Sequence, residues 1–236
     1  RAGSAVAEQA GRHLKKAVLE LGGTDPYVIL DSDDVAAAAK QAWTVRMENT
    51  GQACNSNKRM IVMDDIYDEF VAELVKIAGE MRPTTPKEFA EGTYCPLSSR
   101  GAAEQLDKQL KAAVEAGAKL HVGGELSDEG AYISPAVITD IPRGSESYYQ
   151  EFFGPVAEIY RVSSDEEALE LANDSQYGLG GAVFSTDEDR ATAIAKKLQV
   201  GMANVNTPAG EGAELPFGGV KLSLIHISEP TRLLSI

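Results

Sequence analysis

The chain has 236 residues, 43% of them hydrophobic and 25% charged, and its formal net charge is −14. A chain of this size and composition folds into one or two globular domains with a sizeable core. The acidic balance argues against nucleic acid and anionic membrane as partners, because both bind basic surfaces, and no apolar run approaches the roughly 20 residues of a membrane span.

Helical periodicity and short apolar runs alternate along most of the chain. They predict helices over residues 4–16, 35–48, 66–81, 102–116, 165–173 and 187–198. They predict strands over residues 17–21, 27–30, 58–63, 119–122, 136–139, 157–162, 180–184 and 201–206. Ser4 is a candidate N-cap of the first helix, and Asp31 or Ser32 of the second. Such alternation indicates an α/β fold with a largely parallel sheet flanked by helices.

Two cysteines and three histidines limit the redox and metal chemistry. Cys54 and Cys95 lie far apart and make neither a disulfide framework nor a metal-binding cluster, and the histidines lack zinc spacing. No secretory signal opens the chain. We therefore expect no metal site and a reducing, cytoplasmic location. Cys95 lies in a loop predicted over residues 81–96, and we interpret it as a packing residue.

Cys54 ends a stretch over residues 49–54 that follows a predicted helix. Gly51 and Ala53 are small, so the backbone can turn tightly there and a reagent can approach the thiol. A cysteine in such a setting is a candidate nucleophile. The alternative is a buried structural cysteine, since free cysteine is among the most buried residue types.

Glu20 interrupts an apolar run just before the turn residues Gly22 and Gly23. A carboxylate in such a run costs free energy unless it is paired or has a function. The alternative is an exposed residue at a strand end. Gly3, just before the first predicted helix, could let backbone amides face a phosphate, although an ordinary turn also explains it.

Two loops are rich in residues that favour turns. In the first, Glu151 stands two residues before Phe153 and is followed by Gly154 and Pro155. Glutamate can accept hydrogen bonds from ribose hydroxyls, and phenylalanine can pack on a planar ring. The second loop covers residues 207–219 and contains several glycines and prolines. Either loop could also be a simple connector.

Together these stretches resemble the aldehyde dehydrogenase family over roughly residues 3–221. The resemblance implies the family's catalytic domain over residues 22–221, preceded by a remnant of the dinucleotide-binding domain over residues 1–21. Five motifs carry it, in the family's order: Leu19-Glu20-Leu21-Gly22-Gly23, Gly51-Gln52-Ala53-Cys54, Glu151-Phe152-Phe153-Gly154-Pro155, Asn173-Asp174-Ser175 with Tyr177-Gly178-Leu179, and Pro216-Phe217-Gly218-Gly219.

The resemblance implies NAD- or NADP-dependent oxidation of an aldehyde to a carboxylic acid. The Cys54 thiolate would attack the aldehyde to give a thiohemiacetal, and hydride transfer to the cofactor would leave a thioester. Glu20, in a partly apolar pocket that raises its pKa, would activate the hydrolytic water. Local amides would favour the thiolate, and the Cys54 N–H would be one oxyanion donor.

The resemblance also implies which residues contact the cofactor. Glu151 would hold the nicotinamide ribose, and Phe153 would pack near the nicotinamide ring. Gly3 matches the last glycine of the family's phosphate-side turn, and we assign Leu21 to the cofactor side as well. The residues that choose between NAD and NADP would lie before residue 1.

The resemblance starts late and stops early. Most of the dinucleotide-binding domain and an oxyanion asparagine would precede the chain, and an arm that pairs subunits would follow residue 221. Residues 222–236 look like the translation of a sequencing adaptor, so we expect a non-native tail and exclude it from the fold. We therefore expect an inactive fragment of an enzyme that forms a homo-oligomer, with the fragment lacking the pairing arm.

The substrate is suggested by the runs over residues 21–31 and 215–219, which look closest to the succinate-semialdehyde dehydrogenase branch. The loop over residues 207–215 would shape the aldehyde pocket. A substrate with a second carboxylate needs a cation there; Arg46 is a candidate, although we interpret it as a surface charge on a helix. The alternatives are an acyl-transferring thiol enzyme in which Glu20 is idle, and a catalytically silent fragment whose open sheet edge could aggregate.

Overall fold

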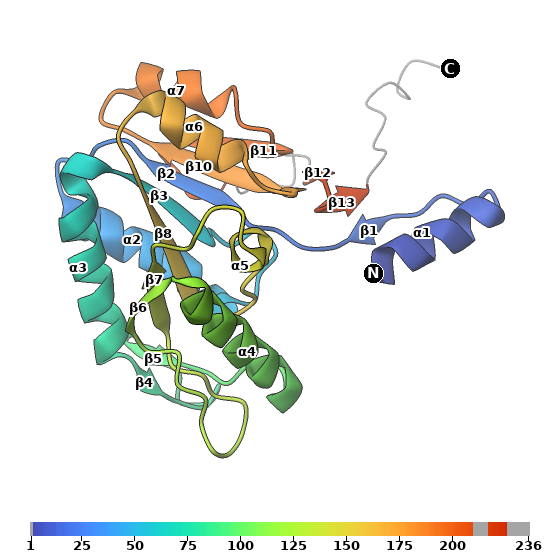
Figure 1. The fold of residues 1–236 in the computed structure, drawn as a ribbon, viewed down its shortest axis with the longest axis horizontal. Helices are drawn as coiled ribbons and strands as arrows, with labels where there is room; N and C mark the ends of the chain where they lie inside the picture. Colours follow the sequence, from blue (N-terminus) through green and yellow to red (C-terminus); the bar gives the residue numbers. More distant parts are fainter. Residues whose placement is uncertain (1, 210–216, 226–236) are drawn as a thin grey trace.

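The computed structural model describes residues 2–209 and 217–225 of the chain. A seven-stranded sheet forms its centre (Figure 1). Every neighbouring pair of strands is parallel except the last, which is antiparallel. The strand order is β11 (Met202–Val205), β10 (Gly180–Phe184), β2 (Pro26–Ile29), β3 (Arg59–Met63), β8 (Val156–Val162), β7 (Ala136–Thr139) and β6 (Lys119–Val122).

Helices cover both faces of the sheet, so the fold has three layers (Figure 1). One face packs against α2 (Val35–Met47) and α3 (Asp64–Glu80). The core of the other face is completed by α4 (Arg100–Ala116), α5 (Glu146–Tyr149), α6 (Asp165–Asn173) and α7 (Glu188–Ala195). None of the described helices is long and apolar enough to cross a membrane.

The inner strand β2 contributes to both cores. Tyr27 and Ile29 belong to the core beneath α2 and α3, whereas Val28 and the following Leu30 belong to the opposite core. Successive side chains of a strand point to opposite faces of the sheet. A parallel strand with helices on both sides is therefore apolar throughout, which explains the uninterrupted apolar run in the sequence.

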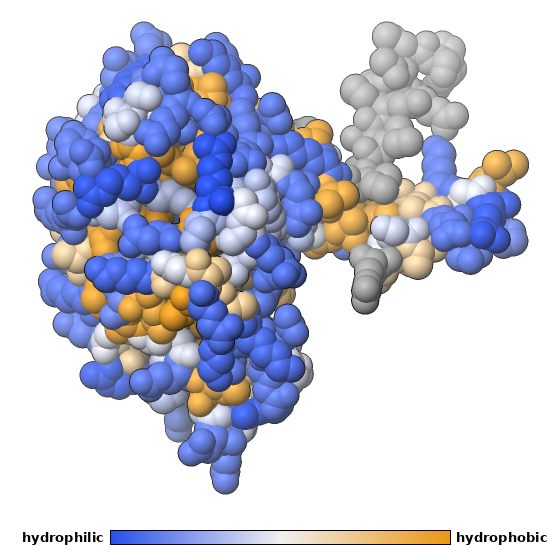
Figure 2. All heavy atoms as spheres, in the orientation of Figure 1, coloured by the Kyte–Doolittle hydropathy of each residue, from blue (hydrophilic) through white to orange (hydrophobic). Residues whose placement is uncertain are grey.

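An arm extends from the sheet domain (Figure 1). It consists of α1 (Ala2–Arg12) and β1 (Leu19–Glu20), and β1 pairs antiparallel with β13 (Leu224–Ile225). Hydrophobic residues gather where the arm joins the body (Figure 2). The candidate residues Glu20 and Leu21 thus lie at the junction between the arm and the sheet domain.

The α/β fold with a largely parallel, helix-flanked sheet is confirmed. The predicted bounds agree for β6, β7, β10 and α6. The loop expected over residues 81–96 contains a short parallel pair, β4 (Arg82–Pro83) and β5 (Thr93–Tyr94), and β1 is shorter than predicted. The sequence also gave no indication of α5 or of the antiparallel pair β9 (Tyr177–Gly178) and β12 (Val220–Lys221).

The ends of two helices differ from the predictions for local reasons. Ser4 lies inside α1 rather than capping it, and α1 ends at Arg12 because Leu14 adopts a left-handed conformation with φ 53°. The Lys15 N–H then donates to the Ala10 carbonyl oxygen at 2.8 Å, a bond typical of a left-handed helix end. The cap of α2 is Asp34 rather than Asp31 or Ser32.

Residues 222–225 are the described part of the segment that we expected to be non-native and excluded from the fold. They contact both the arm and β9. The Leu21 N–H donates to the Ser223 carbonyl oxygen at 3.1 Å, and the Gly178 N–H donates to Ser223 Oγ at 3.0 Å. The structure therefore includes them in the fold. Residues 226–236 lie outside the described residues, and the domain limits at residues 21 and 221 stay predictions.

Candidate active site

The segment before Cys54 has an unusual backbone. Asn49, Thr50 and Gly51 have φ values of 49°, 56° and 74°, all in the left-handed region. Thr50 is β-branched, and such a residue rarely adopts this conformation. Each non-glycine residue held there costs roughly 1–3 kcal/mol, so the turn is strained at Asn49 and Thr50. At position 51 a Cβ would lie 2.2 Å from the Gly154 carbonyl oxygen, so only glycine lets the two loops touch.

Arg46, on α2, holds this strained turn in place. Its side chain is fully buried, so the interpretation as a surface charge is wrong. Because its N–H groups are used internally, it does not serve as a cation for a substrate carboxylate either. The guanidinium donates to the carbonyl oxygens of Val156 (2.7 Å), Gly51 (3.1 Å), Phe152 (2.8 Å) and Gly154 (2.5 Å), and to Ser56 Oγ (2.8 Å).

The Gly22–Gly23 turn lies between the other two motifs. The Gly23 N–H donates to Glu151 Oε1 at 3.1 Å. A Cβ at position 22 would lie 2.6 Å from Glu151 Oε2, and one at position 23 would lie 2.1 Å from the Cys54 carbonyl oxygen. The absence of side chains here brings the glutamate, cysteine and cofactor-side motifs into contact.

Lys58, directly before β3, is a residue to which the sequence analysis assigned no role. Its side chain is fully buried, and its Nζ lies 3.1 Å from Glu151 Oε1. It also donates to the carbonyl oxygens of Ala53 (2.6 Å) and Cys54 (3.1 Å). Burial lowers the pKa of Lys58, and the Glu151 carboxylate opposes that change.

The Cys54 thiol is half-buried, and burial raises its pKa. The Lys58 ammonium and the Asn55 N–H act in the opposite direction, while the Glu20 and Asp25 carboxylates raise the pKa further. A local amide thus favours the thiolate, as expected, but burial outweighs it and the environment as a whole favours the thiol.

Glu20 itself is exposed on β1. We expected a partly apolar pocket around its carboxylate, and the structure differs on this point. Strand β1 lies in the arm. Its first residue, Leu19, is buried and its second, Glu20, is exposed, as expected because successive side chains of a strand point to opposite faces. The Glu20 carboxylate is therefore accessible to water.

The other candidate residues are Gly3, Leu21 and Phe153. Gly3 is buried in the first turn of α1, where a Cβ would lie 2.6 Å from Leu21 Cδ2. Leu21 is 39% exposed and Phe153 is 45% exposed. The Phe153 ring lies beside Lys58, with 5.8 Å between Nζ and the ring centroid. Leu21 and Phe153 are thus both exposed apolar side chains, and Phe153 lies near the lysine that contacts Glu151.

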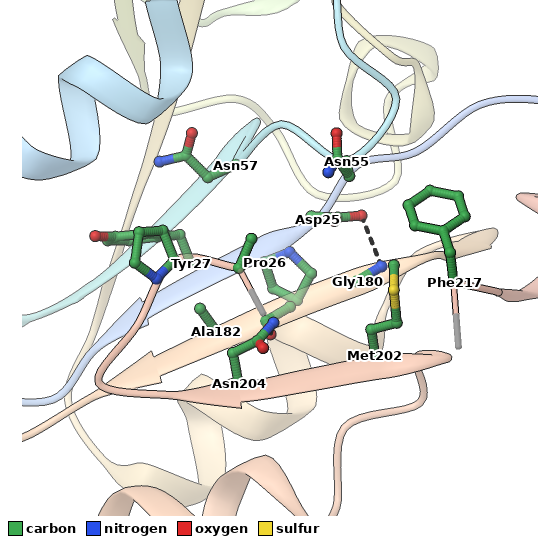
Figure 3. Close-up of a pocket in the computed structure, with 13 residues that line it drawn as sticks. Asp25, Pro26, Tyr27, Asn55, Asn57, Gly180, Ala182, Met202, Asn204 and Phe217 are labelled. Atoms are coloured by element: carbon green, nitrogen blue, oxygen red, sulfur yellow. Dashed lines mark hydrogen bonds between the residues drawn. The ribbon is translucent and has the colours of Figure 1, made fainter. Parts of the chain in front are cut away.

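A small cavity of about 50 Å³ adjoins the cysteine segment (Figure 3). Asp25 lines it, and the Gly180 N–H donates to Asp25 Oδ1 at 3.0 Å. Burial raises the pKa of Asp25 to about 7, and the Gly180 N–H and Lys58 oppose that rise. The cavity is too small to be a ligand pocket by itself. The other lining residues include Asn55, Asn57, Met202, Asn204, Pro208, Ala209 and Phe217.

The loop that we expect to shape the aldehyde pocket is described only in part. Pro208 and Ala209 line the cavity, whereas residues 210–215 lie outside the described residues. Among the residues that the structure describes, no group of three or more His, Cys, Asp or Glu side chains is arranged to hold a metal ion. Cys95 is half-buried in the loop after β5.

The model of the aldehyde dehydrogenase family matches residues 1–233. The chain belongs to this family. The resemblance carried by the five motifs is thereby confirmed, and so is the family's fold, since solved members superpose on the structure.

Three relatives of this aldehyde dehydrogenase chain illustrate the match. The chain is 49% identical over 224 residues to the succinate-semialdehyde dehydrogenase [NADP(+)] of Deinococcus radiodurans, covering 94% of this chain and 47% of that protein. The structure of succinic semialdehyde dehydrogenase from Streptococcus pyogenes in complex with NADP+ matches with a TM-score of 0.86 and 44% identity, covering 95% and 49%. The structure of betaine aldehyde dehydrogenase from Staphylococcus aureus in complex with NAD+ matches with a TM-score of 0.89 and 32% identity, covering 95% of this chain and 45% of that one. The chain spans about half the length of these relatives.

Proposed function

We propose that the protein containing this chain is an NAD- or NADP-dependent aldehyde dehydrogenase with Cys54 as nucleophile and Glu20 as general base. The observation that carries the proposal is the position of the Gly22–Gly23 backbone, which contacts both the Cys54 carbonyl and the Glu151 carboxylate. Glu20 stands two residues before this turn, and its charge acts on the thiol. In this proposal the nucleophile Cys54, the base Glu20 and the Glu151 carboxylate, which accepts hydrogen bonds from the cofactor, share one site.

Cys54 performs the first step in this proposal. Its thiolate adds to the aldehyde carbon, a carbon–sulfur bond forms, and the carbonyl oxygen of the resulting thiohemiacetal takes the negative charge. We assign the Cys54 N–H as a donor to that oxygen. Because burial raises the pKa of the thiol, the reaction depends on a positive charge that opposes the effect of burial.

Glu20 acts on the acyl group that remains on Cys54. A water oxygen bonds to the acyl carbon, the Cys54 sulfur leaves, and the Glu20 carboxylate takes the proton of the water. The exposure of Glu20 on β1 supports this assignment, because the hydrolytic water reaches it directly.

The cofactor side is assigned to Glu151, Phe153, Leu21 and Gly3. Glu151 offers a carboxylate whose side chain is 16% exposed, and Phe153 and Leu21 offer exposed apolar surface. Gly3 lies in the first turn of a helix of 11 residues, where backbone N–H groups suit a phosphate. These residues fit a nicotinamide dinucleotide, which when bound accepts the hydride from the substrate carbon.

Mutagenesis of the full-length protein tests the two catalytic assignments. We expect Cys54→Ala to abolish NAD(P)H formation, whereas Cys95→Ala, the matched control, retains it. Glu20→Gln should slow steady-state turnover by about 10²–10⁴-fold but leave a stoichiometric burst of NAD(P)H, because only hydrolysis is impaired. An unchanged steady-state rate in Glu20→Gln would refute the role of Glu20.

Succinate semialdehyde is the substrate that we infer. The support is that two of the matched relatives carry this activity in their names. Butanal has the same number of carbons but lacks the carboxylate, so it is a matched comparison. We expect a kcat/KM at least about tenfold higher for succinate semialdehyde, the usual value of one specific charged contact. Equal values would exclude carboxylate recognition.

The remaining expectations concern the protein as a whole. We propose a cytoplasmic homo-oligomer, which size-exclusion chromatography with light scattering tests for the full-length protein. The inactivity of the 236-residue chain alone stays a prediction, and NADH formation near the rate of a full-length relative would overturn it. A p-nitrophenyl ester assay comparing the chain with its Cys54→Ala variant measures any remaining thiol chemistry.

A further inference from the structure

Lys58 carries a charge into a part of the protein where no water reaches its side chain. The exposed fraction of the side chain is 0%, although lysine is rarely buried completely. Removing an ammonium from water costs several kcal/mol unless it is paired and hydrogen-bonded. A lysine in this position therefore needs an explanation beyond packing, since a methionine would fill similar space.

The three N–H donors of the ammonium have three oxygen acceptors. These are the carbonyl oxygens of Ala53 and Cys54, at 2.6 and 3.1 Å, and Glu151 Oε1, at 3.1 Å. The acceptors belong to two loops separated by about a hundred residues of sequence, while Lys58 itself precedes the buried strand β3. One ammonium thus joins the cysteine segment to the glutamate on the cofactor side.

We propose that Lys58 is a positioning residue that fixes the cysteine segment relative to Glu151 and provides the positive charge that stabilises the Cys54 thiolate. The inference rests on the proposed function, since it gives Lys58 a part in the same reaction. It adds a third charged group to the site, one that contacts the backbone of the nucleophile rather than the substrate.

The charges around the two groups support this assignment. Burial raises the pKa of the Cys54 thiol, and Lys58 is the main group that lowers it, with a smaller effect from the Asn55 N–H; Glu20 and Asp25 raise it. Lys58 in turn faces the carboxylates Glu151 and Asp25, which favour its charged form, and the Arg46 guanidinium, which disfavours it. Removing the ammonium leaves the Asn55 N–H to oppose the effects of burial and of the two carboxylates.

The test is the pH profile of Cys54 alkylation, which requires neither aldehyde nor cofactor. The chain and its Lys58→Met variant are treated with iodoacetamide between pH 6 and 10, and modification of Cys54 and Cys95 is measured separately by peptide mass spectrometry. We expect the Cys54 profile of Lys58→Met to shift upward by about one pH unit, with a roughly tenfold lower rate at pH 7.5. The Cys95 profile should not change.

Two further variants separate the local charge from other effects. Lys40→Met makes the same chemical change at an exposed lysine that pairs with Glu91 on the surface, and it should leave Cys54 unchanged. Lys58→Arg keeps the charge and should restore the rate to within about threefold of the unmodified chain.

A folded Lys58→Met protein whose Cys54 profile superimposes on that of the unmodified chain would overturn the proposal. A parallel shift of Cys95 would overturn it too, because general loosening would then explain the result. Should Lys58→Met not fold, the double variant Lys58→Met/Glu151→Gln removes both charges of the pair and is expected to show the same shift. Loss of dehydrogenase activity alone would bear on the proposed function and not on these profiles.

Discussion

The Gly23 backbone lies so close to Cys54 that a Cβ at position 23 would stand 2.1 Å from the Cys54 carbonyl oxygen. The nearest atom is backbone, so it cannot move aside as the end of a side chain would. The same carbonyl accepts a hydrogen bond from Lys58. The position of the nucleophile is therefore fixed partly by the absence of a side chain at Gly23, which lies far from Cys54 in the sequence, before β2 and α2.

Gly23→Ala should displace the cysteine segment and destabilise the fold. We expect the free energy of unfolding to fall by about 1–3 kcal/mol, the typical cost of overpacking a closed contact. Urea unfolding followed by circular dichroism measures this change, and iodoacetamide modification of Cys54 reports the displacement.

The control is Gly11→Ala. A Cβ at position 11 would meet no heavy atom within 4 Å, and the residue lies within α1. Alanine stabilises a helix relative to glycine by roughly 0.5–1 kcal/mol, so this variant should be neutral or slightly more stable. If Gly23→Ala proved as stable as Gly11→Ala, the close contact with Cys54 would be wrong.

Arg46→Lys should be costly although it keeps the charge. Lysine cannot reproduce the planar set of donors that bonds four carbonyl oxygens and Ser56 Oγ, so buried acceptors in both loops lose their partners. Burial already lowers the pKa of Arg46 to about 10, with Glu158 and Glu151 opposing. We expect at least about 3 kcal/mol of destabilisation in urea unfolding.

Arg161→Lys is the matched control for that substitution. Arg161 is 44% exposed and pairs with Asp64 and Asp68 at the surface. Surface ion pairs contribute roughly 0–1 kcal/mol, so this variant should unfold close to the unmodified chain. Equal stabilities for the two variants would show that the Arg46 hydrogen bonds do not hold the loops.

The sequence predicted the fold and the motifs because both depend on local patterns. Glycines beside a cysteine or glutamate and apolar runs of strand length can be read along the chain. Arg46 was missed, although Ala39, Ala42, Trp43 and Arg46 follow helical spacing and all are buried, so the arginine continues the apolar stripe of α2. A charged residue on such a stripe is the signal of an internal role. The charged partner of Lys58, Glu151, lies in a distant loop, and the position of Lys58 before an apolar strand is the only local signal.

The cap of α2 shows a second limit of sequence reading. Asp31, Ser32 and Asp34 can all cap a helix, and we expected one of the first two. Asp34 Oδ1 accepts from the Ala37 N–H at 2.9 Å and is the cap. Asp31 instead accepts hydrogen bonds from Ser185 Oγ and the Thr186 N–H, across the neighbouring strand. Competition from such a distant contact cannot be read from the local sequence.

Asp34→Ala therefore should lower the free energy of unfolding by about 1 kcal/mol, the usual value of an N-cap. Ser32→Ala is the control, since Ser32 Oγ accepts from the Asp34 N–H but does not cap the first turn of the helix. Thermal unfolding of both variants measures the difference. A larger loss in Ser32→Ala than in Asp34→Ala would reassign the cap.

Asp25→Asn should change how stability depends on pH. Burial raises the pKa of Asp25 in the folded chain to about 7, from an ordinary value of 3.8. Between these two values the folded state holds a proton that the unfolded state has released, so the stability contributed by protonated Asp25 falls as pH rises through this range. Asparagine keeps an acceptor for the Gly180 N–H and does not titrate.

The free energy of unfolding of Asp25→Asn minus that of the unmodified chain should thus rise by about 1.4 kcal/mol per pH unit, or about 3 kcal/mol between pH 5 and 7, and level off above pH 7. Urea unfolding at pH 5, 6, 7 and 8 measures this difference.

Asp31→Asn provides a comparison of opposite sign. Burial raises the pKa of Asp31, but hydrogen bonds from Ser185 and Thr186 outweigh burial and lower the pKa. The stability that ionised Asp31 contributes is present at neutral pH and lost on acidification, so the deficit of Asp31→Asn should shrink as pH falls. A flat difference for Asp25→Asn would mean that Asp25 is ionised in the folded chain throughout this range.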